Sequence, residues 1–189
     1  MRYVLTLAVF AVLPFVHGCA LVAVGGAAAA GGYLVGEDRR PVNIIAEDKT
    51  VEVRISNRAS DKYPTAHVNA TAYNKLVLLT GEAPTEAAKT DIDEIARGVP
   101  NVRSTVNELQ VGDSTSFSAR ANDSYITSKV KARFLDARRF NPVHVKVVTE
   151  AGTVYLLGIV TRKEADDATE IARTTSGVQK VVRVFEYQN

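Results

Sequence analysis

The chain has 189 residues, a formal net charge of +2 and a single cysteine. Such a small net charge excludes a nucleic-acid-binding polycation, so any electrostatic function must come from local clustering of charged residues. One cysteine allows no intramolecular disulfide, so the folded part must be stabilised by its hydrophobic core.

The N-terminus carries the pattern of an export signal. An almost wholly apolar run follows Arg2 and ends in Gly18-Cys19, which predicts a secretory signal peptide at 1–18. A cysteine directly after the cleavage site resembles the signal of bacterial lipoproteins, and this resemblance implies a diacylglycerol on Cys19. An ordinary signal peptide and an uncleaved anchor helix are the alternatives, although Pro14 and the short apolar run disfavour a spanning helix.

Residues 19–45 are expected to form the lipidated start of the mature chain and a tether rich in Gly and Ala. Such residues offer little side chain to a packed core. A short apolar helix that continues into the bilayer is the alternative. The resemblance to lipoproteins implies export to the outer membrane, because the residue after Cys19 is Ala20 and not an aspartate that would retain the protein in the inner membrane.

The rest of the chain repeats itself. The tetrapeptide Glu94-Ile95-Ala96-Arg97 recurs unchanged as Glu170-Ile171-Ala172-Arg173. Upstream of each tetrapeptide, three apolar residues are spaced four apart, which predicts the buried stripe of an amphipathic helix. These stripes are Val51, Ile55 and Ala59 in the first copy and Ile126, Val130 and Phe134 in the second. We therefore expect two homologous domains, at 46–112 and 122–189, joined by a short linker at 113–121.

Two strands are expected after the first helix of each copy. In the second copy, the β-rich runs 143–149 and 153–159 are joined by a short glycine-containing link, which is typical of a hairpin. Gly81 and Gly158 are expected to end the second strand at matching places.

A second helix and a last strand complete each copy. Thr161 and Glu164 have the spacing of a capping box at the start of the helix. Gly98 and Gly177 are expected to stop the helices, and the run 178–187 predicts the last strand. The order is helix, strand, strand, helix, strand.

This order, the glycine near the end of the second strand and the repeated Glu-Ile-Ala-Arg resemble the BON domain. Together with a lipobox-like cysteine and a Gly/Ala tether, they resemble dual-BON outer-membrane lipoproteins. The resemblance implies an α+β fold of two tandem BON domains, each with a three-stranded mixed sheet packed on two helices.

The two first helices differ in charge. Basic and acidic residues balance at 48–61, whereas five basic residues and one acidic residue occur at 124–140. Tyr125 stands in the second copy where Thr50 stands in the first. Helical spacing puts Tyr125, Lys129, Ala132 and Arg133 beside the buried stripe.

An aromatic side chain on a basic helix is a credible contact for an anionic bilayer. The family resemblance implies that this helix binds anionic phospholipid, such as phosphatidylglycerol, and that the protein supports envelope integrity. The expected phospholipid-binding residues are Tyr125, Lys129, Lys131, Ala132, Arg133, Arg138 and Arg139. The alternatives are a protein-interaction adaptor for an envelope machine, a solvated basic face without a ligand, and a periplasmic holdase.

Catalysis, nucleic-acid binding and metal binding are not expected. No nucleophile–base pair or phosphate-binding loop stands out, and the basic patch lacks interleaved aromatics. His67 and His144 occupy equivalent positions before a strand, which indicates a structural role. Since no cysteine or paired carboxylate is near either histidine in sequence, we expect no metal site and no cofactor besides the lipid on Cys19.

Overall fold

The computed structural model describes residues 37–188. The predicted signal peptide, Cys19 and most of the predicted tether lie outside the described residues. The chain divides into two units, Met1–Asp38 and Arg39–Asn189. The second unit contains both predicted domains and all three hydrophobic core clusters of the described residues. None of the helices described is both long and apolar enough to cross a membrane.

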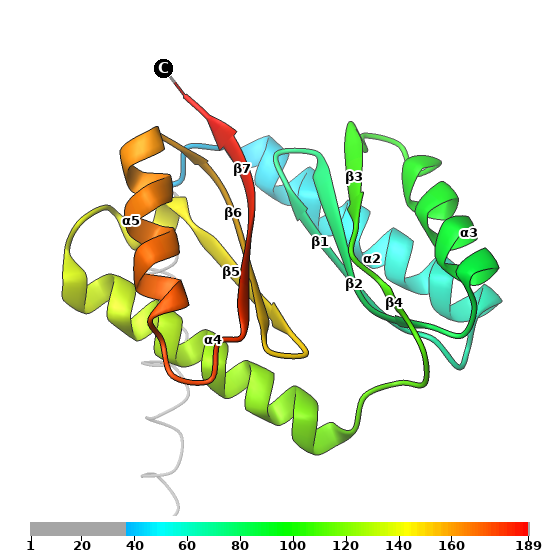
Figure 1. Ribbon diagram of the computed structural model, residues 1–189. Helices are drawn as coiled ribbons and strands as arrows, with labels where there is room; N and C mark the ends of the chain where they lie inside the picture. The colour runs from blue at the N-terminus through cyan, green and yellow to red at the C-terminus, as the bar shows by residue number, and fades with distance from the viewer. Residues whose placement is uncertain (1–36, 189) are drawn as a thin grey trace, which may run out of the picture. The chain divides into compact units, whose positions relative to one another are not determined.

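The element order confirms the predicted repeat (Figure 1). The first half comprises α2 (Val42–Lys62), β1 (His67–Tyr73), β2 (Leu76–Ala83), α3 (Glu86–Arg97), β3 (Ser104–Asn107) and β4 (Gln110–Val111). The second half comprises α4 (Phe117–Ala137), the 3-10 helix η2 (Pro142–His144), β5 (Lys146–Glu150), β6 (Thr153–Val160), α5 (Arg162–Arg173) and β7 (Lys180–Tyr187).

Each half has a mixed sheet with the same topology. In the first half β2 is central, antiparallel to β1 and parallel to β3. In the second half β6 is central, antiparallel to β5 and parallel to β7. The first sheet has one addition to the predicted three strands, because the short β4 also pairs with β2 beyond β3.

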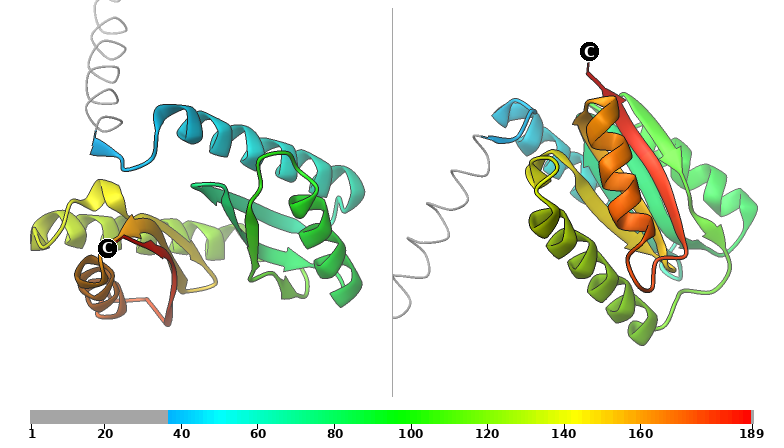
Figure 2. Two further views of the ribbon diagram at one scale, coloured as in Figure 1. Left: turned by 90° about the horizontal axis from the view of Figure 1, so that it is seen from above. Right: turned by 60° about the vertical axis from the view of Figure 1, so that its left-hand side comes forward.

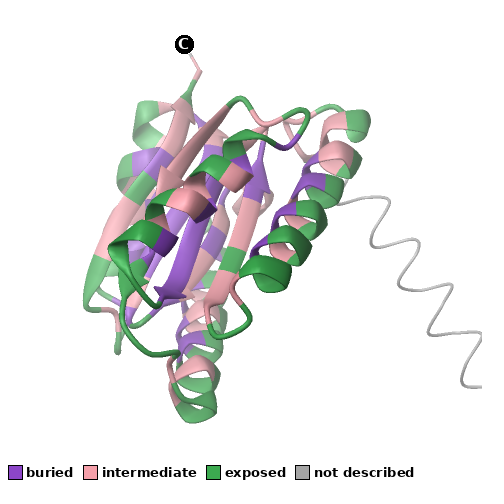
Figure 3. Cartoon of the chain, turned by 90° about the vertical axis from the view of Figure 1, so that its right-hand side faces the viewer, coloured by how far each residue is buried: buried purple, intermediate pink, exposed green. Residues whose placement is uncertain are grey.

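Helices cover one face of each sheet (Figure 2). In the first half, the predicted stripe of Val51, Ile55 and Ala59 is buried against alternate residues of β2. In the second half, Ile126, Val130 and Phe134 pack in the same way. The buried residues line the strands and the inward sides of the helices, whereas the outward helix faces are exposed (Figure 3). The predicted helix stripes are therefore confirmed.

The opposite faces of the two sheets pack on each other. A third core cluster joins Tyr73 and Leu78 from the first half with Tyr155, Leu157 and Val184 from the second. Side chains alternate across a strand, so β2 and β6 each bury residues on both faces. The two halves therefore form a direct interface through their sheets.

Polar contacts reinforce this interface. The Lys146 ammonium donates to Glu52 Oε1 at 2.8 Å and to the Ala72 carbonyl at 3.3 Å. Burial favours the neutral form of Glu52, yet the hydrogen bond and charge of Lys146, together with hydrogen bonds from Lys49 and the Ala72 N–H, outweigh burial and lower the pKa of this carboxyl. Asn74 and Arg103 of the first half both donate to Glu186 of β7. The Lys146 contact ties the first helix of one half to the first strand of the other, and the Glu186 contacts tie the β1–β2 turn and the segment before β3 to β7.

The helices extend past, or stop short of, several of the predicted segment boundaries. Residues 42–45 are helical and not tether, and α4 begins at Phe117, inside the predicted linker 113–121. The α4 helix starts early because the Ser116 side chain accepts a hydrogen bond from the Ala119 N–H, at 3.2 Å, as an N-cap. Helix α4 also ends at Ala137, three residues before the predicted end at 140, because Arg138 adopts a left-handed backbone conformation.

The second strand of each half passes the residue predicted to end it. Gly81 lies inside β2 and Gly158 inside β6. A Cβ atom at Gly81 would lie 2.0 Å from the His67 carbonyl oxygen, and one at Gly158 would lie 2.3 Å from the His144 carbonyl oxygen. Glycine is needed at both places because the backbone that enters the first strand crosses here.

Other details of the second half also differ from prediction. The capping box of Thr161 and Glu164 is confirmed. The first part of the predicted strand 143–149 is instead the 3-10 turn η2, which begins with Pro142. Gly98 is the C-cap of α3 as predicted, but α5 ends at Arg173 with Thr174 as its C-cap, before Gly177.

Candidate functional site

The outward face of α4 combines apolar and basic side chains. Phe117, Tyr125 and Leu135 are 80%, 61% and 64% exposed. Phe117 and Leu135 are separated by about five helical turns, or about 27 Å, and therefore point to the same side of the helix. Large apolar side chains exposed along one helix are a feature of binding surfaces.

The seven residues predicted to bind phospholipid do not share one environment. Tyr125, Lys131 and Ala132 are exposed on α4, and Arg138 is exposed at its C-terminal end. Lys131 and Arg138 can therefore present their charges to an external ligand. We define the α4 surface as Phe117, Tyr125, Lys131, Ala132, Leu135 and Arg138.

Lys129 lies beside this surface and has two contacts within the protein. Its ammonium lies 4.6 Å from the centroid of the Tyr125 ring. It also donates to the Ser176 carbonyl in the loop between α5 and β7. Lys129 thus links the Tyr125 ring to the loop that follows α5.

Arg133 is a structural residue in this arrangement. Its guanidinium donates to the Ile171 carbonyl at 3.0 Å and to Thr175 Oγ1 at 2.9 Å, at the C-terminal end of α5. Cations stabilise helix C-termini because the last carbonyls lack partners. Arg133 is thus half-buried beside the stripe of Ile126, Val130 and Phe134, whereas Tyr125 is exposed, and phospholipid binding by Arg133 stays a prediction.

Arg139 lies beyond the helix. Its guanidinium is 3.5 Å from Asp167 Oδ1 of α5. The segment after α4 turns back, and Phe140 packs edge-on against Phe134 with ring centroids 5.0 Å apart. Part of the positive charge predicted for residues 124–140 is therefore paired with an acidic residue of the second half.

Two apolar members of the α4 surface were missed by the sequence reasoning. Phe117 falls in the segment predicted as linker, and Leu135 follows the buried Phe134. Helical periodicity could have identified Leu135, since it lies off the buried stripe. The N-cap signal at Ser116 could have placed Phe117 in the helix.

The equivalent helix of the first half lacks this combination. At the position of Tyr125, α2 has Thr50, whose hydroxyl donates to the Ala46 carbonyl at 3.0 Å. Two apolar residues of α2, Val42 and Val53, are 66% and 49% exposed, but no aromatic is exposed on it. Lys49 of α2 pairs with Glu52 at 3.0 Å. Helix α2 therefore serves as an internal reference for α4.

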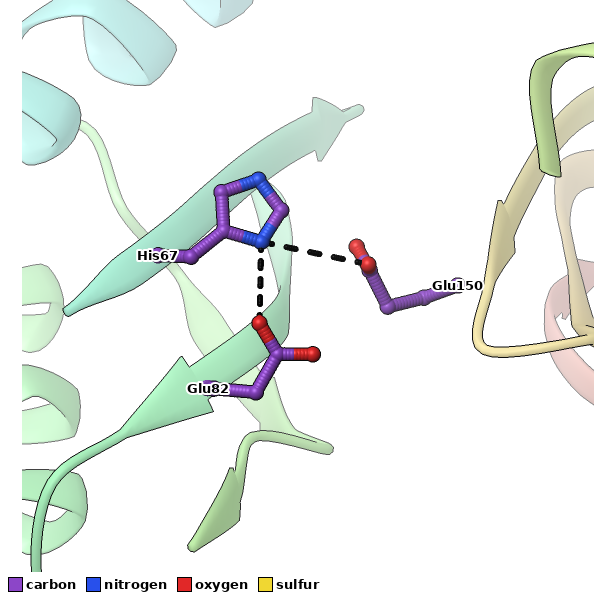
Figure 4. A group of neighbouring side chains, drawn as sticks. All are labelled: His67, Glu82 and Glu150. Atoms are coloured by element: carbon purple, nitrogen blue, oxygen red, sulfur yellow. Dashed lines mark hydrogen bonds and ion pairs between the residues drawn. The ribbon is translucent and has the colours of Figure 1, made fainter. Parts of the chain in front are cut away.

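A second group of polar side chains lies where the two halves meet. His67 of β1 and Glu82 of β2 are directly paired across the strands. The Glu150 carboxylate at the end of β5 approaches the same imidazole (Figure 4). Sequence spacing alone did not bring these residues together, because Glu150 belongs to the other half.

Known proteins resemble this chain over most of its length. A family model of the BON domain matches residues 47–113 and 122–189. The outer membrane lipoprotein DolP of Haemophilus influenzae is 36% identical over 176 residues, which cover 92% of this chain and 90% of that protein. A 21 kDa hemolysin of Actinobacillus pleuropneumoniae is 35% identical over 153 residues, 79% of each chain. Osmotically-inducible protein Y of Escherichia coli is 30% identical over 135 residues, which cover 70% of this chain and 67% of that protein.

Proposed function

The chain belongs to the BON domain family, and from this premise we propose that it is an outer-membrane-anchored lipoprotein that binds anionic phospholipid through α4 and supports envelope integrity. Similarity to an outer membrane lipoprotein over 92% of the chain supports a lipid-anchored, outer-membrane location. The anchor in this proposal is a lipid on Cys19. The proposed role is one of binding, with no catalytic step.

The observation that carries the proposal is the exposure of Tyr125 and Leu135 on the same helix as the exposed Lys131. An amphipathic aromatic ring prefers the headgroup level of a bilayer, where cations meet lipid phosphates. Phe117 extends the apolar contact to the first turn of α4. The α4 surface is thus suited to lie in the plane of a membrane.

Charge adds selectivity for anionic lipid. Each Lys or Arg near an anionic surface contributes about 1 kcal/mol, and salt screens this contribution. Lys131 and Arg138 together would then strengthen binding by about 2 kcal/mol, or roughly 30-fold. An acyl anchor would raise the local concentration of α4 at the bilayer, so a weak contact would suffice.

Vesicle co-sedimentation of residues 37–189 tests this function without the proposed anchor. We expect binding to phosphatidylglycerol-rich vesicles, little binding to phosphatidylcholine vesicles, and weakening by salt. Tyr125→Glu should reduce binding at least several-fold, whereas Thr50→Glu, at the equivalent position of α2, should leave it unchanged. Equal sedimentation with both kinds of vesicle, or with neither, would reject lipid recognition by α4 and favour an adaptor that contacts protein.

A further inference from the structure

The group formed by His67, Glu82 and Glu150 has the composition of a metal site. The imidazole Nδ1 of His67 lies 3.1 Å from Glu82 Oε2 and 4.0 Å from Glu150 Oε1. One ligand atom from each residue lies within 4.8 Å of the others. Figure 4 shows both carboxylates pointing towards the imidazole ring. The potential ligand atoms of the three residues are therefore close to one another.

These distances suit one ion. A tetrahedral Zn²⁺ with bonds of about 2.0–2.2 Å to nitrogen and oxygen has ligand atoms separated by about 3.4 Å. The two separations from His67 Nδ1 bracket this value, and the two carboxylates each offer an oxygen within 4.8 Å of the other. Small side-chain rotations would therefore bring the three donors to bonding distance.

Arg120 lines the cavity beside this group, but it forms no ion pair with either of the two carboxylates. Glu82 and Glu150 are only 6% and 7% exposed. Within residues 37–188, the only basic side chain within ion-pair distance of either is His67. An ionised carboxyl is costly to bury in such a place without a counter-charge. A bound divalent cation would remove that cost.

Neighbouring groups hold both carboxylates in position. The Thr115 N–H donates to Glu82 Oε2 at 3.1 Å. Asn69 Nδ2 donates to Glu150 Oε2 at 2.8 Å, which leaves Oε1 directed at His67. Such hydrogen bonds orient ligands in metal sites. A cavity of about 350 Å³, lined by His67, Asn69 and Glu150 among others, adjoins the group and gives access for an ion and its water.

The second half shows that the fold does not require this group. His144 occupies the position equivalent to His67, but the residue equivalent to Glu82 is Ile159. The nearest carboxylate, Glu164 at 3.4 Å, is held by the Arg39 guanidinium at 2.8 and 2.9 Å. The carboxylate beside His144 is therefore already paired with an arginine. The two carboxylates beside His67 form no ion pair with a lysine or arginine.

We propose that His67, Glu82 and Glu150 bind one divalent first-row transition-metal ion of the Zn²⁺ class and that this ion links the two BON domains. The imidazole nitrogen favours such ions over Mg²⁺ and Ca²⁺, which prefer oxygen ligands throughout. His67 and Glu82 belong to the first domain and Glu150 to the second. Since the ligand set is complete only in the docked arrangement, the ion stabilises the interface between the domains.

The test is calorimetric titration of Zn²⁺ into residues 37–189, prepared without a histidine tag and freed of metal by a chelator. We expect one equivalent bound per chain, a rise in the midpoint of thermal unfolding, and no such rise with millimolar Mg²⁺. Co²⁺ should bind in place of Zn²⁺ and give the visible absorption of a four-coordinate ion.

His67→Ala and Glu150→Gln should each weaken Zn²⁺ binding at least about tenfold, while His144→Ala should bind as the wild type does. Glu150→Gln keeps the side-chain volume, so its unfolding midpoint without metal tests whether the variant is folded. Stoichiometric binding that persists in His67→Ala, or no binding by the folded wild type, would overturn the proposal. Failure here would leave lipid binding by α4 untouched, since no ligand belongs to the α4 surface.

Discussion

Asp48 and Asp123 make the same contact in the two halves of the chain. Asp48 accepts hydrogen bonds from the backbone N–H groups of Asn74 and Lys75 at 2.7 and 2.8 Å. Asp123 accepts from those of Ala151 and Gly152, both at 2.9 Å. Each carboxylate thus joins the first helix to the turn of the hairpin by accepting hydrogen bonds from two successive backbone N–H groups.

We predict that Asp123→Ala lowers the free energy of unfolding by about 2–3 kcal/mol, because two backbone donors lose their acceptor. Urea unfolding of residues 37–189 measures this change. Asp136→Ala, which removes an exposed carboxylate from the same helix, should change stability by less than about 0.5 kcal/mol. Equal effects of the two substitutions would argue against the role of Asp123 in holding the hairpin.

The interface between the sheets should contribute strongly to stability. Leu157 is fully buried in the cluster that joins the two halves. Leu157→Ala should lower the free energy of unfolding by about 2–5 kcal/mol, because it leaves a cavity. Leu135→Ala, on the exposed side of α4, should alter stability little but weaken vesicle binding. If Leu157→Ala were as mild as Leu135→Ala in urea unfolding, the sheet interface would not be a packed core.

The contact of Glu164 with Arg39 predicts a pH dependence of stability. Hydrogen bonds from Arg39, opposed by burial and assisted by Thr161, lower the pKa of Glu164 from 4.5 to about 2. The folded state therefore favours the ionised carboxyl. Its contribution is complete above pH about 4.5 and is lost as pH falls towards about 2.

Glu164→Gln should consequently cost about 1–2 kcal/mol at pH 7, a value reduced by solvent screening of the pair, while a glutamine can still complete the capping box. The difference from wild type should disappear near pH 2. Glu170→Gln, in an exposed pair on the same helix, is the control and should have almost no effect. A difference in urea unfolding that is independent of pH would contradict the electrostatic account.

The fold was largely predictable because its signals are local. The stripe of Val51, Ile55 and Ala59 has the helical period, and the capping box of Thr161 and Glu164 lies within four consecutive residues. The helix ends were less predictable. Ser116 lies in a polar run that looks like a linker, yet its side chain caps α4.

The arrangement of side chains around the sites was less predictable because it depends on contacts distant in sequence. The sequence indicates that Arg133 is a surface cation, whereas in the structure its guanidinium donates to the Ile171 carbonyl of α5. His67 has no carboxylate nearby in sequence, and the β1–β2 register and the domain interface supply Glu82 and Glu150. The continuous apolar run of β2 contained a usable signal, since it is typical of a strand buried on both faces.

The most direct measurement of the central claim compares one fluorophore at equivalent positions of α4 and α2. Residues 37–189 lack cysteine, since the only one is Cys19, so Ala132→Cys and Asn57→Cys can each carry a single polarity-sensitive label. Both positions are exposed in the structure. With phosphatidylglycerol-rich vesicles, the emission at position 132 should shift to the blue and that at position 57 should not. Binding to the vesicles without a shift at position 132 would contradict membrane contact through α4.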